Sequence, residues 1–239
     1  MSWTATTLEV ERTELRQWQT LGINIASGPT ADRCRTRFYV IVKRAIDLPI
    51  AVLLLVVLAP LMLAIALAVR LSSPGPAFFR QKRIGRDARI FHCLKFRSMR
   101  VDAERALRRN PRMWATYVAN DYKLPASDDP RITPFGRFLR RTSLDELPQL
   151  INVIRGEMSL VGPRPIVGAE LDEYGERSDD LLAALPGITG KWQISGRSRL
   201  HYPERANIEL SYVYSWSPIE DFRILLRTVP VVLSRDGAH

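Results

Sequence analysis

An adjacent acidic pair, Asp145 and Glu146, lies among basic residues and is the strongest candidate for chemistry in this sequence. It follows the short basic stretch FGRFLRR (135–141) and opens a segment with helical periodicity through about residue 153. A helix start surrounded by cations favours a phosphate ligand. Ser143 and Glu146 also have the spacing of a capping box, so helix capping is the alternative role for Glu146. For Asp145 this alternative is weaker, because Ser143 already fills the cap position.

Two other segments carry cations that suit phosphate binding. Residues 77–99 predict a β-hairpin around Gly85-Arg86-Asp87, and its cations include Lys95 and Arg97. A solvated basic edge that discourages strand aggregation is their alternative role. Arg164 stands between two prolines in GPRP and has little backbone freedom. A guanidinium held in this way suits bidentate phosphate binding, with a structural salt bridge as the alternative.

The uncharged apolar run from Leu48 to Val69 is about as long as one bilayer crossing of roughly 20 helical residues. Pro60, near its middle, should break or kink a helix, because it lacks an amide hydrogen. Basic residues flank both ends, which favours a re-entrant helix over a spanning one. A buried core helix is a third alternative. Just before the run, Lys43 and Asp47 have the i,i+4 spacing of a pair on one helix face.

The composition predicts an anionic partner and a chain held at a membrane. Lys and Arg number 35 against 25 Asp and Glu, a net charge of +10, which favours phospholipid head groups, phosphorylated substrates or nucleic acid. Cys34 and Cys93 lack zinc-site spacing and are predicted to be free thiols. Residues 1–37 contain no apolar stretch typical of a signal peptide, and we expect a mobile polar tail there.

We predict an α+β fold that is mostly helical, with a re-entrant anchor at 38–73 and a compact domain at 74–239. Residues 101–119 show a helical pattern interrupted at Pro111, and Asp102 and Glu104 fall in its first turn, where capping is their expected role. We expect a helix at 165–174, a loop or short strand pair at 188–197, and helices at 204–215 and 218–229. The last of these is apolar nearly all round, which predicts contact with the membrane interface.

Several stretches together resemble one protein family. They are KRAID before the proline-interrupted apolar run, SPGPAFFRQKRIG, LKFRSM, RRTSLDELPQLINVIRGEMSLVGPRP and PGITGKWQISGR. Over residues 38–235 the chain resembles the bacterial sugar transferases, the monotopic polyprenol-phosphate phosphoglycosyl transferases that initiate exopolysaccharide, capsule, O-antigen and glycoprotein glycan assembly. It is most similar to the exopolysaccharide-initiating undecaprenyl-phosphate galactose phosphotransferases.

The resemblance implies transfer of a sugar-1-phosphate from a UDP-sugar to undecaprenyl phosphate, with Mg²⁺, release of UMP and a covalent intermediate on an aspartate. The family's Asp-Glu pair corresponds to Asp145 as nucleophile and Glu146 as metal ligand. Neighbouring helical side chains diverge by about 100°, so Glu146 can act beside Asp145 only if this turn is irregular. Asp102 and Glu104 are the runners-up for metal ligand or nucleophile, and with Gln149 they are the supporting candidates.

The cations in family-matching motifs are assigned to the diphosphate and the lipid phosphate; they are Lys95, Arg97, Arg140, Arg164 and Arg197. At the predicted membrane break, Ala59-Pro60 departs from the Ser-Pro that the family commonly carries. The resemblance places the protein at the bacterial inner membrane with its catalytic domain on the cytoplasmic face. UDP-galactose is the first expected donor and UDP-glucose the second, and homodimerisation stays open.

The competing hypothesis is a non-catalytic, membrane-tethered basic protein that binds anionic lipid or nucleic acid. It explains the charge and the anchor, but it explains neither an acidic pair set among cations nor the rigid GPRP turn. Few aromatic residues interleave with the basic ones, whereas stacking on bases would require them. We therefore expect no nucleic-acid partner.

Overall fold

The computed structural model describes residues 31–119, 124, 129–196 and 200–234, so most of the predicted polar tail lies outside the described residues. Residues 31–37, by contrast, belong to the folded body. The short helix α2 (Asp32–Arg35) buries Cys34, whose Sγ donates to the carbonyl oxygen of Val213 at 3.5 Å. Arg35 forms an ion pair with Asp180 at 3.4 Å. The folded part therefore begins before the predicted boundary at residue 38.

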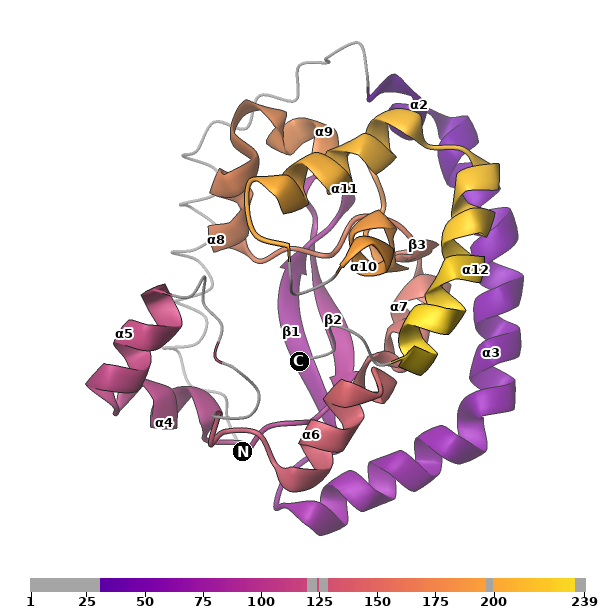
Figure 1. Cartoon of the computed structure of the whole chain (residues 1–239). Helices are drawn as coiled ribbons and strands as arrows, with labels where there is room; N and C mark the ends of the chain where they lie inside the picture. The colour runs from indigo at the N-terminus through magenta and orange to yellow at the C-terminus, as the bar shows by residue number, and fades with distance from the viewer. Residues whose placement is uncertain (1–30, 120–123, 125–128, 197–199, 235–239) are drawn as a thin grey trace.

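The apolar run forms the middle of one long helix, α3 (Arg37–Ser72), capped by the Thr36 hydroxyl, which accepts from the amide of Tyr39. The helix is continuous through Pro60, so the predicted break is not a gap in helical structure. Figure 1 shows α3 descending along one side of the molecule and then changing direction beneath the hairpin. Only 17% of its most apolar 18-residue window is buried, which excludes the buried core helix. By length and composition α3 could cross a membrane.

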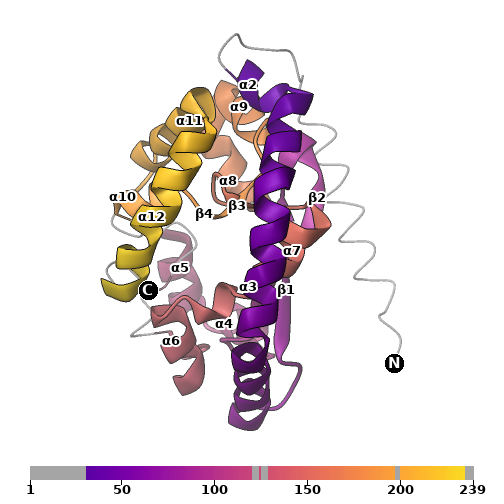
Figure 2. The same ribbon diagram turned by 90° about the vertical axis from the view of Figure 1, so that its right-hand side faces the viewer.

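The first part of α3 is fastened to two C-terminal helices, α11 (Glu204–Ser215) and α12 (Pro218–Ser234). Lys43 is 1% exposed, and its Nζ lies 2.7 Å from Asp221 Oδ2 on α12. It also donates to the carbonyl oxygen of Val161 and to the hydroxyl of Tyr212 on α11. Lys43 therefore forms its ion pair with α12, against which this face of α3 packs, while its charge still acts on Asp47, as the i,i+4 spacing predicted. Both α3 and α12 descend from the same end of the molecule (Figure 2).

The predicted hairpin is confirmed, and it forms the centre of the fold. Strands β1 (Phe78–Ile84) and β2 (Ile90–Phe96) pair antiparallel through the 3₁₀ turn η1 (Arg86–Ala88), with Phe78 opposite Phe96. Helix α7 (Gln149–Arg155) packs against β2 through the fully buried Asn152. The Asn152 side chain accepts from the amide of Leu94 at 3.0 Å and donates to the carbonyl of His92 at 2.8 Å. This amide thereby completes the outer edge of β2.

A second, parallel sheet joins β3 (Ser159–Val161) to β4 (Gly187–Thr189). Gly187 is required where they meet, because a Cβ there would lie 2.1 Å from the Gly162 amide nitrogen. The expected loop or strand pair at 188–197 is instead β4 followed by α10 (Lys191–Ser195). The expected helix at 165–174 is divided into α8 (Gly168–Leu171) and the 3₁₀ segment η3 (Asp172–Arg177), before α9 (Ser178–Leu182).

The remaining helices agree well with the sequence pattern. Helices α4 (Ala103–Arg108) and α5 (Pro111–Ala119) are separated before Pro111 as predicted, and α6 (Pro134–Arg141) forms the basic stretch. Helix α12 extends past the predicted end at Val229 and exposes an apolar face. This face, made of Ile219, Phe222, Leu226 and Val229, is 58–64% exposed, as an interfacial helix requires.

Candidate active site around Asp145

The acidic pair lies in an irregular connection between α6 and α7. Ser143 has a left-handed conformation with φ 57° and forms no side-chain cap, so the predicted capping box is wrong. The chain instead makes one 3₁₀ turn, η2 (Leu144–Glu146), and α7 begins after Pro148. The ring of Pro148 and its missing amide hydrogen disfavour a continuous helix through this segment. Asp145 and Glu146 thus lie in the irregular turn that their combined action was expected to need.

Asp145 is a buried carboxyl group with a perturbed pKa. It is 7% exposed, and burial together with the negative charge of Glu146 raises its pKa to about 6. Lys95 and Arg140 act in the opposite direction and favour the ionised form. A carboxylate held at this balance is still mostly charged at neutral pH. It is also poorly hydrated, which favours reaction with a bound group over interaction with water.

Cations approach the acidic pair from two elements. Lys95 of β2 lies 2.7 Å from Glu146 Oε1, in a partly buried ion pair. Arg140 of α6 donates from Nε to the hydroxyl of Ser98 at 2.8 Å. Burial lowers the pKa of Arg140, while Asp145 is the largest influence that raises it. The structure therefore brings together four predicted site residues: Lys95, Arg140, Asp145 and Glu146.

A buried ion pair behind Arg140 is a feature that the sequence reasoning missed. Asp129 is 2% exposed and binds Arg131 through two contacts of 2.8 Å, from Nε to Oδ1 and from Nη2 to Oδ2. The charge of Asp129 also raises the pKa of Arg140. The only sequence signal was an Asp-Asp-Pro loop at 128–130, which has no distinguishing pattern. Asp129 helps to hold two arginines near the site.

Arg164 lies in a second charged cluster, against the ring of Trp192 with 5.4 Å between guanidinium carbon and ring centroid. Its Nε is buried and has no hydrogen-bond partner among the described residues. The cluster includes Glu170, which pairs with Arg83 at 3.4 Å and with Arg205 at 3.2 Å. Burial raises the pKa of Glu170, but Arg205 and Arg164 outweigh it, and the net shift is downward.

The two clusters lie along one face of the hairpin, because Arg83 is paired with Phe91 and the side chains of Phe91, Cys93 and Lys95 alternate onto the same face of β2. Burial raises the pKa of the Cys93 thiol on this strand, and its charged neighbours come from both clusters. Lys95 and Glu146 act on it from one cluster, and Arg83 and Arg164 from the other. Charges from both clusters therefore act on the same buried thiol of β2.

Arg97 is placed differently from the other predicted cations. Its guanidinium donates to the carbonyl and hydroxyl oxygens of Ser73, at 2.7 and 2.9 Å, and to the carbonyl of Pro74 at 2.8 Å. These groups follow the last turn of α3, where backbone carbonyls lack helical partners. Arg97 therefore fixes the end of the apolar helix to the domain, and we assign it this positioning role.

The remaining predicted residues of the site are Asp102, Glu104, Gln149 and Arg197. Asp102 is exposed and bonds Arg100 at 3.2 Å, and Glu104 belongs to α4, with no side-chain position described. Gln149 is buried at the start of α7. Arg197 lies outside the described residues. Among the described residues, no three His, Cys, Asp or Glu side chains form a metal-binding group.

A buried carboxylate flanked by cations, close to a helix apolar enough for a membrane, is the arrangement of a membrane-associated protein that handles phosphorylated ligands. The model of the family described as bacterial sugar transferase matches residues 38–235, and the chain belongs to this family.

Characterised relatives are similar over most of this chain. An undecaprenyl-phosphate galactose phosphotransferase of Salmonella typhimurium is 44% identical over 82% of this chain and 41% of its own length. The exopolysaccharide production protein ExoY of Sinorhizobium fredii is 43% identical over 82% of this chain and 88% of its own. A UDP-glucose:undecaprenyl-phosphate glucose-1-phosphate transferase of Caulobacter vibrioides is 41% identical over 82% of this chain and 72% of its own length. The chain spans about two fifths of the length of several relatives, including the Salmonella protein.

Proposed function

We propose that this protein transfers a sugar-1-phosphate from a UDP-sugar to undecaprenyl phosphate, the first membrane step in assembly of an exopolysaccharide or related glycan. The observation that carries the proposal is the buried Asp145 carboxyl group, with its raised pKa, between Lys95 and Arg140. Relatives named for this transfer with galactose and with glucose support it. A non-catalytic basic protein would not need a carboxylate held in this costly environment.

The reaction proceeds in two balanced displacements at one phosphorus atom. An Asp145 carboxylate oxygen attacks the phosphorus that carries the sugar, and the bond from this phosphorus to the UMP oxygen breaks. Undecaprenyl phosphate then attacks the same phosphorus, and the Asp145 oxygen leaves as carboxylate. The product is undecaprenyl-diphosphate-sugar, and a covalent intermediate divides one exchange into two easier steps.

The cations have distinct parts in this scheme. Phosphoryl transfer depends mainly on positioning and charge neutralisation, so Lys95 and Arg140 stabilise the phosphate oxygens beside Asp145. Arg164, stacked on Trp192, offers a guanidinium fork for the second phosphate. Its unpaired buried Nε supports this assignment, because an unpaired donor in such a place is costly without a ligand.

The carboxylates fit Mg²⁺ as a cofactor. This ion keeps several water ligands and usually binds one or two carboxylates together with substrate phosphates, so three protein ligands are not required. Glu146, with Asp145 beside it, would hold the ion. Lys95 would then exchange its ion pair with Glu146 for a contact with the substrate phosphate. When bound, Mg²⁺ supplies positive charge to the diphosphate.

The membrane arrangement follows from the same proposal. The acceptor phosphate lies at the head-group layer, so the domain would meet it at the cytoplasmic face of the inner membrane with α3 re-entrant. Replacing Pro60 with Leu removes the ring and restores one amide hydrogen, which favours a straight spanning helix. We expect periplasmic labelling of a cysteine placed at residue 5 in this variant, with Cys34 replaced. Labelling with Pro60 intact would contradict the re-entrant arrangement.

Activity is tested with the purified full chain, undecaprenyl phosphate, Mg²⁺ and a panel of UDP-sugars. Release of UMP together with sugar transfer to lipid is the expected result, with UDP-galactose tested first and UDP-glucose second. The matched control is Asp172→Asn, which removes an exposed carboxylate from η3. Absence of UMP release with every sugar would refute the proposed activity and favour the lipid-binding alternative.

A further inference from the structure

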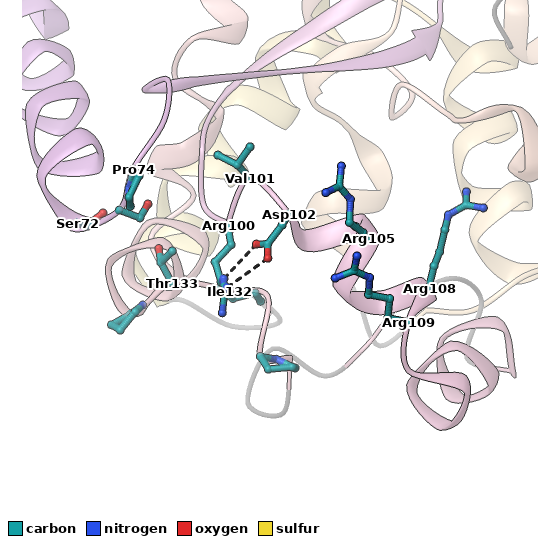
Figure 3. A pocket seen from close by; sticks show the side chains of 13 residues that line it. Ser72, Pro74, Arg100, Val101, Asp102, Arg105, Arg108, Arg109, Ile132 and Thr133 are labelled. Carbon is teal, nitrogen blue, oxygen red and sulfur yellow. Dashed lines mark hydrogen bonds and ion pairs between the residues drawn. The ribbon is translucent and has the colours of Figure 1, made fainter. Parts of the chain in front are cut away.

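A broad pocket of about 1130 Å³ lies where the end of α3 meets α4, apart from the acidic pair. One wall is the segment Ser72–Pro74 at the end of α3, and another is α4 with the residues just before it. Figure 3 shows Ser72, Pro74 and Thr133 on one side and three arginines on the other. None of Lys95, Arg140, Asp145 and Glu146 lines this pocket.

The lining of this pocket is strongly basic. Among the described residues its lining contains four arginines, Arg100, Arg105, Arg108 and Arg109, and one acidic residue, Asp102. The Arg100–Asp102 pair is exposed, with side chains 62% and 50% accessible, so it is weak and open to exchange. Arg105 and Arg109 are exposed, and their side chains form no hydrogen bond or ion pair within the described part of the chain. Two guanidinium groups are thus available for an anion.

The position of the pocket indicates where such an anion would come from. It opens at the point where the exposed apolar surface of α3 ends, after Leu67 and Leu71, which are 61% and 78% exposed. Arg97 fixes this end of the helix to the domain. In a membrane that holds the apolar part of α3, the pocket therefore lies at the head-group layer. Val101, 70% exposed in the pocket wall, offers an apolar contact beside the arginines.

We propose that this pocket binds the phosphate head group of a resident anionic phospholipid, of the phosphatidylglycerol type, and so fixes the depth of the α3 end in the membrane. The acceptor lipid is a poorer occupant, because a reacting phosphate must come within about 3–3.5 Å of its partner and the pocket contains none of the acidic pair. A nucleotide is also poorer, because no aromatic ring in the part of the chain that the structure describes lines the pocket for its base.

The test measures binding of dioctanoyl-phosphatidylglycerol and dioctanoyl-phosphatidylcholine to the full chain in neutral detergent. The pocket variant is Arg105→Gln/Arg109→Gln. The matched control, Arg89→Gln/Arg177→Gln, removes the same charge from exposed positions away from the pocket. We expect the parent to prefer phosphatidylglycerol by at least about tenfold, and only the pocket variant to lose this preference. Circular dichroism checks that both variants are folded.

Several results would overturn the proposal. These are equal binding of the two lipids by the parent, unaltered preference in the pocket variant, or the same loss in the control variant. Displacement of phosphatidylglycerol by an equal concentration of UMP or inorganic phosphate would assign the pocket to soluble anions. A raised KM for undecaprenyl phosphate in the pocket variant, with phosphatidylglycerol binding retained, would assign it to the acceptor. Binding needs no turnover, so this test is independent of the proposed activity.

Discussion

Replacing Asp145 with asparagine should raise stability at neutral pH while abolishing activity. Burial and Glu146 raise the pKa of this carboxyl from 3.8 to about 6, so the folded state favours the protonated form. The stabilisation from the neutral form is complete below pH 3.8 and is lost as the pH rises through 6. A shift of about two pKa units corresponds to about 3 kcal/mol. Asp145→Asn removes the ionisable group, so the variant does not lose this unfolding free energy as the pH rises.

The assay is thermal unfolding of the full chain in detergent at pH 8 and at pH 4. Asp145→Asn should unfold at a higher temperature than the parent at pH 8 and at nearly the same temperature at pH 4. The control Asp172→Asn, at an exposed position, should match the parent at both. A destabilised Asp145→Asn protein at pH 8, or an equal difference at both pH values, would refute burial as the cause of the shifted pKa.

The same variant should lose at least about a thousandfold in turnover, roughly 4 kcal/mol of barrier, because an amide cannot attack phosphorus. A gain in stability together with a loss of activity would identify Asp145 as a residue kept for function at a cost to the fold. Near-parental turnover would remove it as the nucleophile.

Three further predictions follow from the surrounding residues. In the parent, kcat/KM should fall as the pH decreases below about 6, the pKa of Asp145 in the free protein, and a fall that begins only near pH 4 would contradict the raised pKa. Arg164→Lys should lower kcat/KM by at least about tenfold with little change in thermal stability, because lysine keeps the charge but loses the bidentate guanidinium. Activity equal to that of the parent would show that Arg164 has only a structural role. Arg97→Gln should cost about 2 kcal/mol of stability through lost bonds to the end of α3, and unaltered thermal unfolding would exclude this fastening.

Local patterns in the sequence predicted most elements of the fold. The hairpin at 77–99, the interruption at Pro111 and the helix at 204–215 follow from alternation, turn residues and helical periodicity, and the structure confirms them. Strand β4 was harder, because its partner β3 is distant in the sequence and a three-residue parallel strand has no periodicity of its own.

The site was predictable as a set of residue types, but not as a geometry. The capping-box spacing at 143–146 was misleading, because Pro148 and the left-handed Ser143 produce a 3₁₀ turn where a helix start was expected. Arg97 lies in a motif rich in cations, yet tertiary contacts direct it to the end of α3. Lys43 likewise pairs with Asp221, which is 178 residues later in the chain and cannot be found by helical spacing.

The most direct test of the account is to trap the intermediate. The full chain is incubated with a UDP-sugar and Mg²⁺ without undecaprenyl phosphate, quenched in acid and digested with trypsin for mass spectrometry. Cleavage after Arg141 and Arg155 gives one peptide, 142–155, that carries both Asp145 and Glu146. We predict added sugar-phosphate mass on this peptide, with fragment ions placing it on Asp145. The same adduct on Asp102, or no adduct anywhere in a preparation that transfers sugar-phosphate once undecaprenyl phosphate is added, would contradict the account.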